Sequence, residues 1–398
     1  MRSLNFADMG VNLVETEDAS FDLANLEAPS AKIVAESLML LRAVIRIADR
    51  CDPAIGDRAR DLVLRLLPYA RSQKVLFGLA LHPALALDYA ASSIVLSSIG
   101  YRDTTIEELL KVSLDASTAA GRERLPHRAL EQAWLRWTLG LGPFPLDQIA
   151  NTALVNGFDL LSGNRDDVYA FTHALMYATD FGAAGLPGEY VGDLVFQRAR
   201  SALAGALDDD DFDLAGELLF TWPFLRYKWD AIASFAFQVL ATVEDEVGAL
   251  PSQALNRKAY EQYDEEVREK YVAAATYHTA YVMGLLCASI MATDERPVAV
   301  HGIETKLTLK EANDALLEEL YQQNARPQWL QIARTLTSDV ATSIAPLILD
   351  VAIRRSVRDL NLKRIRELLI FGVQNEIEPT LLRYQAAELL GRTAKLSA

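Results

Sequence analysis

Cysteine, histidine and clustered positive charge are all scarce in this sequence. It contains only 2 cysteines and 5 histidines among 398 residues. We therefore expect no disulfide framework, a reducing compartment such as the cytoplasm, and no resident metal or other cofactor. The alternative is a mixed metal site formed by His173, Asp180 and His278. Because 54 acidic residues outnumber 39 basic ones and no stretch is strongly basic, nucleic acid is excluded as a partner.

Export signals and clear membrane spans are also missing from the pattern. The first thirty residues are rich in acidic groups and contain no apolar run of signal-peptide length. Residues Tyr271 to Thr293 carry no formal charge and are long enough to cross a bilayer. However, His278 and several tyrosines are spread along this stretch instead of gathering at two interfaces. We expect it, like Val75 to Gly100, to be a buried helix of a soluble protein that has no membrane partner.

Apolar residues are abundant, and their spacing is helical nearly everywhere. Hydrophobic residues make up 51% of the chain and charged residues 23%, so a large core can form. No segment alternates long enough to predict a strand. The pattern predicts an all-α fold. The expected helices are 29–49, 54–71, 82–100, 104–120, 126–140, 146–155, 165–180, 187–207, 211–221, 229–243, 256–292, 308–324, 327–340, 343–357, 361–374 and 378–392.

The connections between these helices are mostly short, which favours antiparallel helical hairpins. No repeat of fixed period occurs, so we expect an α/α toroid-like ring, with an open α-solenoid as the alternative. The expected organisation is an irregular acidic segment (1–28), a main helical body (29–293), a connecting loop (294–307) and a C-terminal helical layer packed on the body (308–398). The high apolar content would also allow a homodimer.

A stripe of uncharged polar and acidic residues follows the helix expected at 165–180. Asp166, Tyr169, His173, Tyr177 and Asp180 fall within an arc of about 80° of a helical wheel. A face with no long charged side chains suits a partly buried polar cavity, where phenol, imidazole and carboxylate groups hydrogen-bond one another. The alternative is an ordinary face in contact with water.

A similar stripe follows the helix expected at 256–292. The alternative for this helix is a tyrosine packing seam. If both stripes face one cavity, that cavity contains two histidines, several aspartates and several phenols, which is a set suited to acid/base chemistry. The residues of the second stripe are Tyr260, Tyr263, Asp264, Tyr271, His278 and Tyr281.

Two further groups could line the same cavity. His127, Glu131 and Trp134 share one face near the start of the helix expected at 126–140, although a His and a Glu four residues apart often form only a local pair. Trp222 could line the cavity or fill core volume. We take all four as candidate substrate-binding residues.

The aspartate-rich run from Asp208 to Asp213 contains the patterns DDxxD and DxDD. These patterns resemble those of class I and class II terpene cyclases, whose carboxylates bind magnesium or protonate an alkene. The second magnesium motif of class I is not apparent. The alternative is a solvated connection that caps the following helix, because acidic residues are favoured at helix starts.

Three segments resemble an uncharacterised all-helical bacterial family often seen beside natural-product biosynthetic genes. They are RLPHRALEQAWL at 124–135, THALMYATDFG at 172–182 and YHTAYVMGLLCA at 277–288. The resemblance implies a cytoplasmic bacterial protein tied to specialised metabolism. It implies no activity and no catalytic residue.

These patterns lead to one main functional hypothesis and two rivals. The main hypothesis is an enzyme that uses cofactor-independent acid/base chemistry, such as cyclisation, elimination or hydrolysis, on a small or peptide-like metabolite. The first rival is a helical scaffold or regulatory protein whose tyrosine grooves bind a partner protein or peptide. The second is a terpene-type cyclase that uses the run from Asp208 to Asp213.

The main hypothesis assigns roles to eight residues of the two stripes. His173 is the general base or acid, and Asp180 or Asp166 orients it. Tyr177 and His278 donate hydrogen bonds to developing negative charge. Tyr169, Tyr271 and Tyr281, together with Asp166, bind substrate and shape the pocket.

Overall fold

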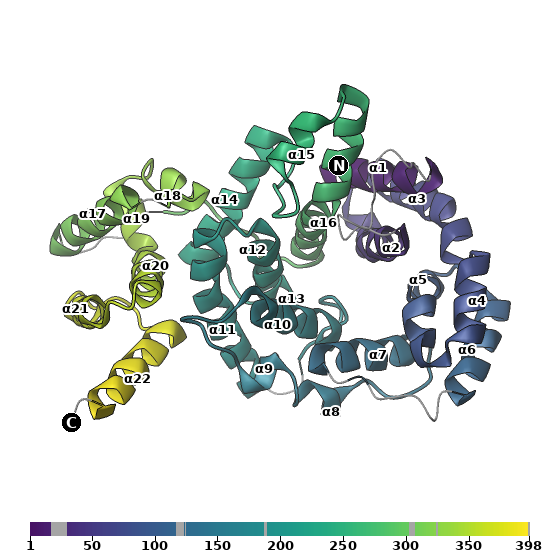
Figure 1. Cartoon of the computed structure of the whole chain (residues 1–398), viewed down its shortest axis with the longest axis horizontal. Coiled ribbons are helices and arrows are strands. Elements are labelled where there is room, and N and C mark those ends of the chain that lie inside the picture. Colours follow the sequence, from purple (N-terminus) through teal and green to yellow (C-terminus); the bar gives the residue numbers. More distant parts are fainter. Residues whose placement is uncertain are drawn as a thin grey trace. The chain divides into compact units, whose positions relative to one another are not determined.

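The computed structural model describes residues 1–16, 30–116, 123, 125–186, 189–301, 307–323 and 325–396. Across these ranges the regular secondary structure is helical and contains no strand, which confirms the all-α prediction. Figure 1 shows the helices along the chain and the connections between them.

The helices of the first half are α1 (Arg2–Thr16), α2 (Ser30–Arg46), α3 (Pro53–Ala70), α4 (Gln73–Leu81), α5 (Ala86–Ser98), α6 (Thr104–Ala116), α7 (Pro126–Thr138), α8 (Leu146–Ile149), α9 (Ala153–Asn156), α10 (Arg165–Ala178) and α11 (Glu189–Asp208). Two short 3₁₀ helices, η2 (Ala48–Arg50) and η3 (Pro83–Leu85), lie among them.

The helices of the second half are α12 (Phe212–Leu219), α13 (Thr221–Leu225), α14 (Ala231–Val247), α15 (Arg257–Gln262), α16 (Glu265–Ala292), α17 (Leu307–Gln322), α18 (Gln328–Ala333), α19 (Ser338–Ser343), α20 (Ala345–Arg358), α21 (Leu362–Gln374) and α22 (Leu381–Leu396).

Local capping explains where many of these helices begin. The side chain of Asp52 accepts a hydrogen bond from the amide of Ala54, and Pro53 occupies the first turn of α3. Asp230 caps α14, which ends at Gly248 with a left-handed φ of 90°. These signals depend on residues close in sequence, so the sequence alone predicts the helix starts well.

The structure differs from the sequence prediction at several elements. The irregular segment expected at 1–28 is wrong for Arg2–Thr16, which forms α1. This helix buries Leu4, Ala7, Val11 and Val14 at helical spacing; residues 17–28 lie outside the described ranges. Helices α4 and α13 were not predicted. The long helix expected at 256–292 is divided into α15 and α16, because Asp264 caps a new helix.

The chain forms two compact units. Unit 1 comprises 1–151, 176–184 and 249–294, and unit 2 comprises 152–175, 185–248 and 295–398. In unit 1, α1 packs on α16 and α2 packs on α3. In unit 2, α11 packs on α12 and α20. The division therefore differs from the expected order of a body at 29–293 followed by a layer at 308–398.

No single helix in the described part of the chain is both long and apolar enough to cross a membrane. Gln73–Leu81 and Pro83–Ser98 meet the length and composition criteria only as a pair, and that pair is bent by 117°.

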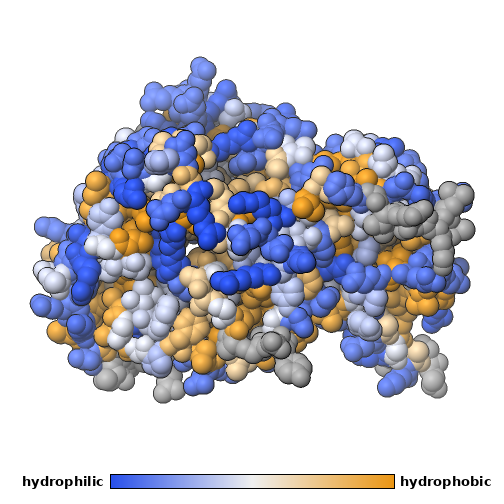
Figure 2. Space-filling view, turned by 180° about the vertical axis from the view of Figure 1, so that it is seen from behind, coloured by the Kyte–Doolittle hydropathy of each residue, from blue (hydrophilic) through white to orange (hydrophobic). Residues whose placement is uncertain are grey.

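The surface contains both apolar and hydrophilic side chains. Figure 2 shows apolar and hydrophilic residues interspersed over one face, as is usual because apolar atoms cover much of a folded protein's surface.

Candidate functional site

In unit 2, His173 on α10 lies beside a buried carboxylate on α12. Its Nδ1 is 3.7 Å from Oε2 of Glu217 and 3.1 Å from the carbonyl oxygen of Tyr169. Glu217 is only 1% exposed, and its Oε2 accepts a hydrogen bond from Thr172 Oγ1 at 2.5 Å. The Tyr169 ring lies against the imidazole, with the ring centroids 3.6 Å apart. Neighbouring groups thus hold both the imidazole and the carboxylate in place.

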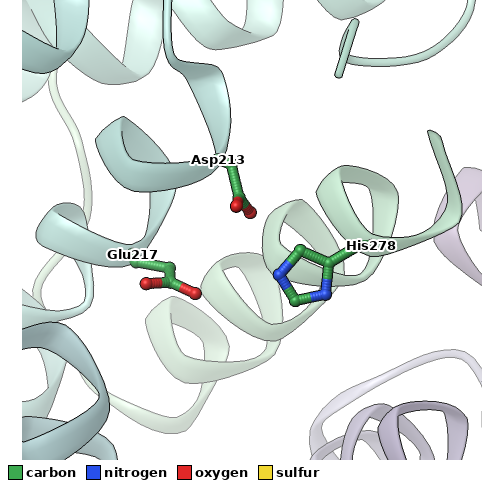
Figure 3. A group of neighbouring side chains, drawn as sticks. All are labelled: Asp213, Glu217 and His278. Atoms are coloured by element: carbon green, nitrogen blue, oxygen red, sulfur yellow. The ribbon is translucent and has the colours of Figure 1, made fainter. Parts of the chain in front are cut away.

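A second carboxylate, Asp213, lies one turn before Glu217 on α12. Figure 3 shows both side chains on this helix, and they present carboxylate oxygens within 4.8 Å of each other. Divalent cations bind oxygen at 2.0–2.6 Å, so the two carboxylates are close enough to share one cation. Arg165 already pairs with Asp213 at 2.7 Å and with Asp211 at 3.0 Å, which neutralises part of this negative charge.

Asp166, one of the two residues expected to orient His173, is exposed in the first turn of α10. The seven-residue separation places it about 10 Å from His173 along the helix axis. The carboxylate found beside the imidazole is instead Glu217.

Asp180, the other expected orienting residue, lies in unit 1 beyond the end of α10. Its φ of 46° is left-handed, so it leaves the helical face on which the wheel placed it. Its carboxylate pairs with Arg42 at 2.6 Å and Arg46 at 2.7 Å and accepts a hydrogen bond from Trp134 Nε1 at 2.9 Å. Asp180 is 4% exposed. These contacts make Asp180 an anchor that connects the end of α10 to α2 and α7.

Tyr177 and Glu131 form a hydrogen-bonded pair beside this anchor. The Tyr177 hydroxyl donates to the Glu131 carboxylate, and its ring centroid lies 5.4 Å from that of Trp134. Burial raises the pKa of Glu131, despite the opposing charge of Arg128. Burial also lowers the pKa of His127, and the charge of Arg128 adds to this effect.

Unit 1 therefore brings together four candidate site residues that come from two separate segments of the sequence. These residues are Glu131, Trp134, Tyr177 and Asp180.

The second stripe contributes His278, Tyr271 and Tyr281 to unit 1. The imidazole of His278, drawn in Figure 3, has its Nδ1 2.9 Å from Glu36 Oε2. Burial would raise the pKa of Glu36, but the charge and hydrogen bond of His278 hold it below its usual value.

Both tyrosines are 2% exposed. The Tyr281 hydroxyl lies 2.8 Å from Ser37 Oγ, and the Tyr271 hydroxyl accepts from the Asn256 amide at 2.9 Å. Buried rings with bonded hydroxyl groups are what a tyrosine packing seam requires. They offer no exposed aromatic surface.

Trp222 lies in the core of unit 2. It is 0% exposed, and its ring packs against Phe196 and Trp229 at centroid distances of 5.2 and 6.1 Å.

The aspartate run is paired within unit 2. Asp208, 6% exposed, binds Arg355 with a shortest distance of 2.6 Å, and Asp209 pairs with Arg358 at 2.7 Å. Asp210 accepts from the Gln328 amide at 2.9 Å. Asp211 caps α12, as the capping alternative expected, although Asp208, Asp211 and Asp213 are buried and only Asp209 is exposed. The carboxylates that a magnesium–diphosphate site would need therefore already have partners.

Sequence reasoning missed Glu217, Arg42 and Arg46. A signal was present for two of them. Glu217 is the only charge between Asp213 and Arg226, and Arg42 follows the apolar run LMLL within the helix expected at 29–49. Isolated charges in apolar surroundings need a partner, but the sequence does not say which one.

Comparisons with known proteins give a family and no activity. No curated protein and no solved structure matches the chain. Residues 7–288 match the model of a family described as a domain of unknown function, DUF6895. The match includes every candidate site residue from His127 to Tyr281. The chain therefore belongs to the DUF6895 family.

Proposed function

We propose that the protein is an enzyme that performs cofactor-independent acid/base chemistry on a small or peptide-like metabolite. His173 is the general base or acid, and Glu217 is the positioning residue that orients it. The observation that carries this proposal is the buried Glu217 carboxylate 3.7 Å from His173 Nδ1. A carboxylate behind an imidazole fixes the ring and stabilises the imidazolium that forms during proton transfer.

The surroundings of Nδ1 favour one tautomer of the neutral imidazole. Both the Tyr169 carbonyl and the Glu217 carboxylate are acceptors, so Nδ1 carries the proton. The lone pair is then on Nε2, which is the atom that would take a proton from substrate. Cyclisation, elimination and hydrolysis each require such a transfer.

The cellular setting belongs to the same proposal. The segments at 124–135, 172–182 and 277–288 resemble a bacterial family often seen beside natural-product biosynthetic genes. This resemblance supports a cytoplasmic bacterial enzyme of specialised metabolism.

Loss of the proposed base should abolish turnover. Incubation of the purified protein with a small-molecule extract of a bacterial culture, followed by mass spectrometry, would identify compounds that it consumes. We expect His173→Ala to slow this conversion about a hundredfold or more and Glu217→Gln to slow it to a smaller degree. Asp166→Asn is the matched control and should leave the rate unchanged. Full conversion by His173→Ala would refute the assignment.

The proposed orientation of His173 by Glu217 can be tested without a substrate. The protein has 5 histidines, so long-range nitrogen NMR of histidine-labelled protein can resolve each ring. We expect neutral His173 to carry its proton on Nδ1, and we expect Glu217→Gln to alter that tautomer balance while Asp166→Asn does not. A proton on Nε2 in the wild type would contradict the proposed mechanism.

A further inference from the structure

Unit 2 contains a pocket that shares no lining residue with the His173–Glu217 pair. Its volume is about 1120 Å³, and its walls come from the segment 156–162 and from α11, α20, the α20–α21 connection, α21 and α22. The lining is mainly apolar and includes Leu161, Ile365 and Leu389. A mainly apolar lining with a few polar groups is typical of sites for small organic ligands.

One cation in this lining has no carboxylate partner. The half-buried Arg198 on α11 donates from its guanidinium to the carbonyl oxygens of Leu154 and Val155, and it forms no ion pair with any described residue. Burial lowers the pKa of Arg198, but a guanidinium stays charged at neutral pH. Its charge is therefore available to an anion that enters the pocket.

The absence of a side chain at Gly157 leaves room for this guanidinium. A Cβ atom at Gly157 would lie 2.8 Å from Arg198 Nη2, and the residue has a left-handed φ of 73°. Only glycine meets both requirements without strain.

The other two arginines of the lining have carboxylate partners. Arg358 pairs with Asp209 at 2.7 Å, and Arg392 lies 3.9 Å from Glu388. Asp159 accepts hydrogen bonds from the Leu161 and Ser162 amides. Among the arginines of the lining, Arg198 is thus the one without a carboxylate partner among the described residues.

One apolar residue of the lining is exposed to solvent and has an unfavourable backbone conformation. Leu360, between α20 and α21, is 84% exposed and has a left-handed φ of 54°. This conformation is unfavourable for leucine. Tyr384 of the same lining is 60% exposed. Exposed apolar groups beside a pocket favour a ligand with an apolar body.

We propose that this pocket binds an anionic amphiphile, with its carboxylate or phosphate head on Arg198 and its apolar chain along the leucine-rich walls. The proposal does not depend on the acid/base site, because the two sets of residues are separate.

Calorimetric titration of the full chain with dodecanoate, dodecyl phosphate and dodecanol, each below its aggregation limit, tests the proposal. We expect at least one of the two anions to bind, and the tighter one identifies the head group. Arg198→Gln should weaken that binding about tenfold or more, whereas Arg198→Lys keeps the charge and should retain most of it. Arg366→Gln, an exposed arginine outside the pocket, is the matched control. Dodecanol binding as tightly as both anions, or no anion binding at about 1 mM, would overturn the proposal.

A second variant separates binding from folding. Asparagine tolerates the left-handed conformation, so Leu360→Asn should raise the thermal stability while weakening the binding of the dodecyl chain. Opposite changes in stability and affinity cannot come from partial unfolding. Unchanged affinity in both Leu360→Asn and Arg198→Gln would show that the amphiphile binds elsewhere and would overturn the proposal.

Discussion

Asp350 on α20 is a carboxyl group with almost no contact with solvent, at 2% exposed. Its Oδ1 lies 3.2 Å from Arg383 Nε and accepts a hydrogen bond from Thr380 at 2.9 Å. Burial raises the pKa of Asp350 to about 7, because desolvation outweighs the charge of Arg383. A carboxyl group whose pKa is higher in the folded state stabilises the protein at low pH, and that contribution is lost as the pH rises through the folded pKa.

Asp350 should therefore make the free energy of unfolding fall as the pH rises from about 4 to about 7. The contribution is up to about 1.4 kcal/mol per pH unit. Urea denaturation across this range should show that Asp350→Asn removes this slope, since asparagine does not titrate. Comparison of the two proteins at each pH cancels the contributions of other groups. Parallel pH profiles for wild type and variant would be inconsistent with the shifted pKa.

At the scale of elements, the aspartate run joins helices of unit 2 that are distant in sequence. Asp208 at the end of α11 reaches Arg355 on α20 across 147 positions, and Asp210 reaches the start of α18 across 118. Asp211 connects α12 to Arg165 of α10. The run is thus a structural junction, and its members differ sharply in burial.

This difference predicts unequal costs for two neighbouring substitutions. Asp208→Asn leaves the buried Arg355 guanidinium without its counter-charge and should destabilise the protein by about 3 kcal/mol or more. Asp209→Asn breaks a pair that is 44% and 43% exposed and should cost less than about 1 kcal/mol. Chemical denaturation of both variants measures the contrast. Equal losses would contradict the account based on burial.

At the scale of the whole molecule, the two units are interleaved along the chain. Segments 152–175 and 185–248 fold with 295–398 in unit 2, and α11 packs on α20. The C-terminal helices are therefore part of a shared core and not an added layer, even though the family match ends at residue 288.

Truncation after Asp294 should accordingly disrupt unit 2. The shortened chain exposes apolar side chains of α11 and leaves Asp208 without Arg355, so we expect aggregation or loss of cooperative unfolding. Size-exclusion chromatography and thermal unfolding followed by circular dichroism measure this outcome. A monomeric fragment with a transition close to that of the full chain would show that the C-terminal helices are dispensable.

The sequence by itself determined the helical class and most helix starts. Helical periodicity and caps act over a few residues, so Pro126 correctly marks the start of α7, although the cap at Asp264 before α16 was missed. It also placed Tyr169 and His173 on one face of a helix, where their rings do lie together.

The tertiary structure alone decided which charged side chains became partners. The wheel assigned Asp180 to His173, but Asp180 follows the end of α10 and pairs with Arg42 and Arg46, more than 130 positions away. Likewise, His173 lies beside Glu217, 44 positions further along the chain. Periodicity shows which face of a helix is buried, but it does not show which other helix packs against that face. A buried charge is stable only beside a partner. The packing of one helix against another therefore determines the role of each charged residue.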